Sequence, residues 1–145
     1  MRNFVFVFFI GLLSTACSRN PEIKLTAFKE IPHELQGCIC YSSKTEKDLD
    51  DRNYVFVSDL EANAFVALNG KLTQLKLLKT SQQQNRFGNY DYKNIYTNDS
   101  LQIAVDIKYK ATIVAEESWS NTGTITVKHE NGETTTQSFE GECGC

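Results

Sequence analysis

Five cysteines are the residues of this chain whose type and spacing are best suited to chemistry. Cys17 follows a short apolar run near the N-terminus. The other four form two Cys-x-Cys pairs, at positions 38 and 40 and at positions 143 and 145. Four thiols can form two disulfides, hold zinc or copper(I) as thiolates, or cycle as a redox pair. The spacing of the two pairs must decide between these roles.

The two pairs favour structural disulfides. Residues i and i+2 of a strand point to one side, so two extended segments would each present two sulfurs on one face. Antiparallel segments would join Cys38 to Cys145 and Cys40 to Cys143, whereas parallel segments would join Cys38 to Cys143 and Cys40 to Cys145. Structural zinc sites usually place two to four residues between cysteines, and here one intervenes. Acidic residues beside Cys143 also disfavour the thiolate that redox chemistry needs. A metal site made of the four thiolates is kept as the alternative.

The segment before Cys17 has the features of an export signal. Met1-Arg2-Asn3 is a short basic start, and Phe4 to Leu13 is an apolar run too short to span a membrane, which takes about 20 residues. The small residues at positions 14–16 then lead into Cys17. This pattern resembles the lipobox of bacterial lipoprotein precursors, in which the cysteine is lipidated and becomes the first mature residue. The resemblance implies a signal peptide over 1–16, a lipidated Cys17 with a tether over 17–22, and a single β domain over 23–145.

The same resemblance implies a bacterial envelope protein that is lipid-anchored, with the outer membrane expected because Ser18, not aspartate, follows the lipidated position. Removing residues 1–16 takes Arg2 and no acid, which leaves 14 basic and 18 acidic residues and a net charge of -4. A negative domain is mildly repelled by an anionic bilayer, so the lipid is the expected membrane contact. This charge also lacks the basic footprint of a nucleic-acid-binding protein. The oligomeric state is left open.

The remaining polar residues form no recognisable catalytic pattern. His33 and His129 have no second ligand at metal spacing. No nucleophile elbow, phosphate loop or dinucleotide-binding glycine pattern occurs. We therefore expect a protein that is not an enzyme and that needs no cofactor.

Residues 86–96 are unusually rich in aromatic side chains among Arg, Asn and Lys. Tyrosine-rich loops make good contact surfaces, because each ring brings a large area and few rotatable bonds. The interpretation favoured over a contact surface is a strand or loop whose tyrosines pack at one end of the β domain.

Alternating apolar and polar residues predict the strands that must position these groups. Leu101 to Lys110 is a half-buried strand pattern, and Tyr54 to Val57 is a second β-branched and aromatic run. Asn69-Gly70 predicts a two-residue type I′ turn. That turn pairs Leu68 with Lys71 and Ala64 with Leu75. It places Val66, Leu68, Leu75 and Leu77 on one face.

A second Asn-Gly pair, at 131–132, predicts another hairpin between 124–130 and 133–139. A two-residue turn there sets Ile125 and Val127 opposite Ser138 and Thr136, with Glu130 opposite Glu133. This weaker alternation indicates an exposed or edge hairpin. Residues 44–52 are either one helical turn or a loop. The chain is thus expected to be all-β, a small antiparallel barrel or sandwich braced by disulfides.

Three segments carry a second resemblance. Cys40-Tyr41, residues 54–58 and Ala64-Phe65-Val66-Ala67-Leu68-Asn69-Gly70-Lys71 leading to Leu75 are similar to membrane-bound inhibitors of c-type lysozyme. Those proteins are small antiparallel β-barrels, and many are lipoproteins. The family's inhibitory Ser-Gly-x-x-Tyr motif is not continuous here, and the resemblance implies Ser81 and Tyr90 as the nearest positions, with Lys93 as a basic probe. The candidate binding residues are Ser81, Arg86, Phe87, Tyr90, Tyr92, Lys93 and Tyr96.

These observations favour a lipid-anchored envelope protein whose β domain binds a partner without catalysis. The partner is expected to be a protein, and the resemblance specifies a lysozyme-like enzyme. The alternatives are a metal-handling lipoprotein with the four thiolates as its site and a purely structural envelope component.

Overall fold

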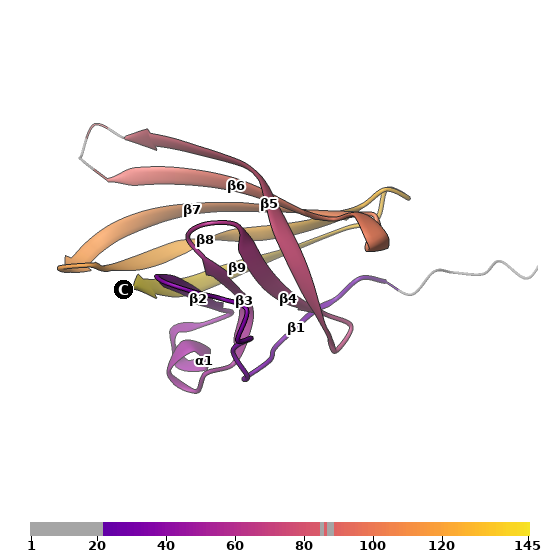
Figure 1. Ribbon diagram of the computed structural model, residues 1–145, viewed down its shortest axis with the longest axis horizontal. Coiled ribbons are helices and arrows are strands. Elements are labelled where there is room, and N and C mark those ends of the chain that lie inside the picture. Colours follow the sequence, from indigo (N-terminus) through magenta and orange to yellow (C-terminus); the bar gives the residue numbers. More distant parts are fainter. Residues whose placement is uncertain (1–21, 85, 87–88) are drawn as a thin grey trace, which may run out of the picture.

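The computed structural model describes residues 22–84, 86 and 89–145, and Cys17 and Phe87 lie outside them. Strands β2 to β9 form a closed eight-stranded antiparallel barrel (Figure 1). Each strand pairs with the next along the chain, and β9 pairs with β2 to complete the ring. The elements are β1 (Leu25–Thr26), β2 (Ile39–Ser43), α1 (Glu46–Asp50), β3 (Tyr54–Asp59), β4 (Asn63–Leu68), β5 (Lys71–Gln84), β6 (Tyr90–Asn98), the 3-10 turn η1 (Asp99–Leu101), β7 (Ile103–Ala115), β8 (Ser118–His129) and β9 (Thr134–Gly144). The expected all-β barrel is confirmed.

Two disulfides join the first and last strands of the barrel. Because β2 and β9 run antiparallel with Cys40 opposite Cys143, the bridges are Cys40–Cys143 and Cys38–Cys145. This is the antiparallel alternative of the two pairings. All four sulfurs are used in these bridges, so none is a thiolate that could hold zinc or copper(I), and the alternative of a four-thiolate metal site is not supported.

The hairpin at Asn69-Gly70 has the predicted register. Both turn residues have positive φ, at 50° for Asn69 and 80° for Gly70. Leu68 pairs with Lys71 and Ala64 with Leu75. Of the four apolar residues predicted to share a face, Val66 and Leu75 are buried in the barrel core, and Leu68 and Leu77 are partly buried and pack against it.

The prediction for the second hairpin is wrong by one residue. Ile125 lies opposite Gln137 and Val127 opposite Thr135. The turn contains three residues, because the His129 N–H donates to the Glu133 carbonyl. Glu130, predicted to face Glu133, instead donates its N–H to the Gln102 carbonyl.

The predicted edge position of this hairpin is also wrong. Strands β8 and β9 are paired on both sides within the closed barrel. Ile125 and Val127 are fully buried. Closure of the barrel therefore buries one face of this hairpin, although its alternation of apolar and polar residues is weak.

The barrel has one core inside and a smaller cluster outside. Buried side chains such as Val105, Val127 and Leu75 fill the interior. Outside β2–β4, a second cluster is covered by the segment before β2 and by α1; it comprises Leu35, Tyr54, Val57 and Phe65, with Phe28, Ile39, Tyr41 and Leu49 packed against it.

Two further predictions concern residues 44–52 and Leu101. Residues 44–52 do form a helical turn, α1, whose N-terminus is capped by the Thr45 hydroxyl accepting from the Asp48 N–H at 3.1 Å. Leu101, predicted to begin a strand, lies in η1 instead and is 39% exposed. In the part of the chain that the structure describes, no helix is long and apolar enough to cross a membrane.

Candidate functional site

The tyrosines of the aromatic-rich segment lie in strand β6. That strand pairs with β5 on one side and β7 on the other along its whole length. Tyr90, Tyr92 and Tyr96 occupy alternate positions opposite Ala111, Tyr109 and Val105, so they face the barrel interior. Tyr96 is 3% exposed and belongs to the core. Of the two interpretations of residues 86–96, these positions favour packing of the rings at one end of the barrel over an exposed contact loop.

The other candidates lie elsewhere. Ser81 and Lys93 are cross-strand partners on the outer face of β5 and β6, where the Ser81 hydroxyl donates to the Lys93 carbonyl at 3.4 Å. The Lys93 ammonium lies 3.5 Å from the Asp106 carboxylate. Arg86 is an exposed turn residue, and Phe87 is outside the described residues. The structure thus separates the candidates into an inner and an outer group, which do not form one site.

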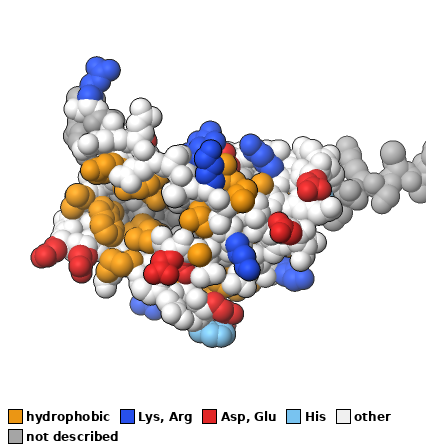
Figure 2. Space-filling model, turned by 45° about the horizontal axis from the view of Figure 1, so that its top comes forward, with side chains coloured by type: hydrophobic (Ala, Val, Ile, Leu, Met, Phe, Trp, Pro, Cys, Tyr) orange, Lys and Arg blue, Asp and Glu red, His pale blue; other side chains and the backbone are white. Residues whose placement is uncertain are grey.

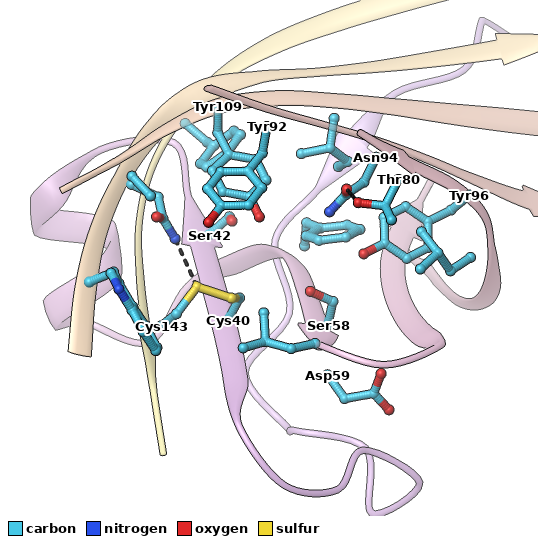
Figure 3. Close-up of a pocket in the computed structure, with 18 of the residues that line it drawn as sticks. Cys40, Ser42, Ser58, Asp59, Thr80, Tyr92, Asn94, Tyr96, Tyr109 and Cys143 are labelled. Atoms are coloured by element: carbon cyan, nitrogen blue, oxygen red, sulfur yellow. Dashed lines mark hydrogen bonds between the residues drawn. A yellow bond between two sulfur atoms is a disulfide. The ribbon is translucent and has the colours of Figure 1, made fainter. Parts of the chain in front are cut away.

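A cavity of about 350 Å³ lies at one end of the barrel, the mouth (Figure 3). Toward the opposite end, the core residues Ile125, Val105 and Val127 are fully buried and close the cavity from below. Hydrophobic side chains surround a hollow on the face shown in Figure 2. The side chains that line it include Cys40, Ser42, Phe56, Ser58, Asp59, Glu61, Thr80, Tyr92, Asn94, Tyr96, Tyr109, Ala111, Trp119, Asn121 and Cys143.

Aromatic rings form much of the cavity wall. Tyr92 and Tyr109 are cross-strand partners whose rings stack at 4.9 Å with an interplanar angle of 11°. Their hydroxyls point into the cavity (Figure 3). Across it, Phe56 and Tyr96 meet edge to face at 5.4 Å. Trp119, the chain's only tryptophan, completes the wall. The cavity therefore offers flat, electron-rich faces to a ligand.

Asn121 provides a polar atom that is fixed in orientation and unsatisfied. Its side-chain N–H donates to the Cys143 sulfur at 2.9 Å, the dashed line in Figure 3. Its Oδ1 is buried and has no hydrogen-bond partner among the described residues. In Asn94, by contrast, the carbonyl oxygen accepts from the Thr80 hydroxyl at 2.7 Å. Asn121 thus presents an unused acceptor in a cavity wall.

Negative charge lies at the rim of the cavity. Burial of Asp59 raises its pKa, but hydrogen bonds from the Asn63 side chain and from the N–H groups of Asn63, Ala62 and Glu61 outweigh burial, so the pKa is lowered overall. These bonds, at 2.8–3.1 Å, also fix the turn between β3 and β4. The exposed Glu61 adds a second acid.

Alkaline pH is expected to unfold the barrel through its buried tyrosines. Burial raises the pKa of Tyr96 and of Tyr109 above the ordinary value of 10.0. A raised folded-state pKa means that stability is fully present below the unfolded-state value and falls as pH rises beyond it. We expect the free energy of unfolding to stay level up to about pH 10 and then decline, with a smaller decline in Tyr96→Phe. Urea titrations from neutral to alkaline pH check this, and a decline equal in both proteins would contradict it.

The described residues that line the cavity include no histidine. Among residues 22–84, 86 and 89–145, no three His, Cys, Asp or Glu side chains are grouped so as to hold a metal ion. His33 is exposed beside Glu34, and the His129 Nδ1 accepts from the Asn131 N–H in a turn. The arrangement can bind a molecule in the cavity, and its described groups show no nucleophile with an adjacent base.

Of the residues that line the cavity, the sequence patterns singled out Tyr92, Tyr96, Cys40 and Cys143. Tyr109, Trp119 and Asn121 are among the lining residues that they did not identify. Their signal was present, because Trp119 and Asn121 continue the alternating inward positions of β8 that lead to Ile125 and Val127. Comparison with protein-family models, with curated proteins and with solved structures finds no match to this chain.

Proposed function

We propose that this chain is a lipid-anchored protein of the bacterial envelope that binds a ligand at the barrel mouth without catalysis. The observation that carries the binding function is a cavity closed below by the barrel core and lined by aromatic rings and a fixed polar acceptor. Eight-stranded barrels are just wide enough to hold one small ligand. The export pattern before Cys17 supports the anchor.

The position of the tether suits this function. The described chain begins near β1, at the end of the molecule away from the C-terminus (Figure 1). Cys143, near the C-terminus, lines the mouth. A tether at residues 17–22 would leave the mouth turned away from the membrane, where it is open to molecules of the envelope.

The anchor is tested by lipid labelling in a bacterial host. Wild-type protein is expected to incorporate labelled palmitate and to fractionate with membranes, whereas Cys17→Ala is expected to do neither, because the only proposed lipid attachment site is removed. Equal labelling of the two proteins would contradict the assignment of Cys17.

The mouth is tested by amide chemical-shift mapping with a mixed set of small cationic, neutral and anionic fragments. Shifts are expected at mouth residues and not on the outer face. Ala111→Trp should abolish them by filling the cavity, while Lys110→Trp, one residue along β7 and facing outward, should not. Shifts that are absent, or that persist in Ala111→Trp, would contradict the proposed site.

Inhibition of a lysozyme-like enzyme is the second candidate. It is favoured by the barrel fold, which the resemblance implies, and by the placement of Ser81 beside Lys93 on an accessible face. Purified protein is expected to slow cell-wall lysis by a c-type lysozyme, and Ser81→Ala with Lys93→Ala should weaken this effect. Unchanged lysis at equimolar and excess protein would exclude this candidate and leave the mouth cavity unaffected.

A further inference from the structure

We infer that the mouth cavity takes a small protonated organic amine, with its apolar body among the rings and its ammonium group against Asn121. This inference rests on the proposed binding function, and it names the class of ligand. It follows from the size of the cavity, its charge, its rings and the fixed acceptor in its wall.

The cavity limits the ligand to a small molecule. Its volume of about 350 Å³ is at the low end of the roughly 300–1,000 Å³ found for small-molecule sites. The closed bottom at Val105 and Val127 prevents a chain from threading through the barrel. One ring with a short side chain fits these limits.

The charges around the cavity favour a cation. Among the described residues that line it, none is Lys, Arg or His. Asp59 and Glu61 are the charged residues among them. The lowered pKa of Asp59 keeps its carboxylate ionised, although both of its oxygens accept hydrogen bonds within the turn after β3. The nearby Lys93 points to the outer face, where it pairs with Asp106. The charged residues of the lining are therefore all negative, which disfavours an anionic ligand.

The fixed acceptor requires a hydrogen-bond donor from the ligand. Asn121 lines the cavity and is 4% exposed, and its N–H bond to the Cys143 sulfur holds the amide in one orientation. A buried carbonyl oxygen without a partner is costly, so a ligand that donates to Oδ1 gains binding free energy. An ammonium N–H forms the stronger, charge-assisted bond.

The aromatic rings also favour a positively charged ligand. A cation near the face of a Tyr or Trp ring is attracted by the negative π surface, and more strongly where water is excluded. Tyr92, Tyr109 and Trp119 lie on the wall shared by strands β6, β7 and β8. The acceptor and the rings therefore both select a positive ligand over a neutral one of the same shape.

Trp119 provides the readout, since it is the only tryptophan and lines the cavity. Its fluorescence is titrated with phenethylamine, 2-phenylethanol and 3-phenylpropionate, which share a ring and differ in charge. The amine is expected to bind on the order of tenfold more tightly than the alcohol, and the acid is expected not to bind. Equal or tighter binding of the alcohol or the acid would overturn the amine assignment while leaving mouth binding intact. No response to any probe, together with no shifts in the mapping experiment, would overturn both.

A second set of measurements isolates the role of Asn121. Asn121→Leu is expected to weaken phenethylamine binding about tenfold but to leave benzyltrimethylammonium, which has no N–H, nearly unchanged. Tyr92→Leu should weaken both cations. Tyr41→Leu is the matched control, because that ring belongs to the outer cluster, and it should weaken neither. An equal loss for both cations in Asn121→Leu would refute the contact to Oδ1. If Asn121→Leu does not fold, the affinities of the wild-type protein decide. Binding of benzyltrimethylammonium as tight as that of phenethylamine would refute the contact to Oδ1.

Discussion

Removal of both disulfides is expected to lower the free energy of unfolding by about 6–7 kcal/mol, whereas removal of either one should cost only about 2 kcal/mol. The single-bridge variants are Cys38→Ala with Cys145→Ala, and Cys40→Ala with Cys143→Ala. The bridges span 107 and 103 residues. In the chain-entropy model the first bridge to close such a loop contributes about 4.7 kcal/mol. The second then closes a ring of only a few residues and contributes about 2 kcal/mol.

Urea unfolding of the wild type, the two single-bridge variants and the four-alanine variant measures these differences. The account predicts that the combined loss exceeds the sum of the single losses by about 2–3 kcal/mol, because either bridge alone holds β2 against β9. If the two single losses instead add up to the combined loss in the free energy of unfolding, the idea that either bridge alone holds β2 against β9 would be contradicted.

Gly123→Ala is expected to destabilise the barrel by about 3 kcal/mol or more. An added Cβ would overlap the Lys108 carbonyl oxygen and approach the Tyr109 Cβ to 2.7 Å and its Cα to 2.8 Å. These atoms belong to the paired backbone of β7 and cannot move without disturbing the sheet. Glycine thus permits the close approach of strands that ring closure needs at this point.

Gly144→Ala is the matched control, since a Cβ there would come no closer than 3.9 Å to the Glu117 carbonyl oxygen. It is expected to change stability by less than about 0.5 kcal/mol. Thermal and urea unfolding of both variants provide the comparison. Equal stability of the two alanine variants would contradict the packing described for Gly123.

Local sequence patterns predicted the parts of the fold that local interactions determine. The register of the Asn69-Gly70 turn could be predicted because Asn and Gly both tolerate the positive φ that a two-residue turn needs. The Cys-x-Cys spacing limited the disulfides to two pairings, and strand direction selected one of them. The turn at 131–132 could not be predicted, because its register depends on the Gln102 carbonyl, which is distant in sequence and accepts the Glu130 N–H.

The cavity was harder to predict than the strands. Alternation shows which residues share a face, but the faces of β6 and β8 near the mouth are both polar enough to be taken as exposed. Tyr92, Asn94 and Asn121 face inward only because β2 and β9 close the ring. Hydrophobicity identified the deep core around Val105, where the alternation is strong, and could not identify the half-buried mouth.

The most direct test of the binding cavity is a crystal structure of the protein soaked with phenethylamine. The account predicts electron density for the ring between the aromatic walls, with the nitrogen within hydrogen-bond distance of Asn121 Oδ1. The crystals must leave the mouth free of lattice contacts, and the amine concentration must be one that saturates the change in Trp119 fluorescence. A cavity that contains only water under these conditions would contradict the account.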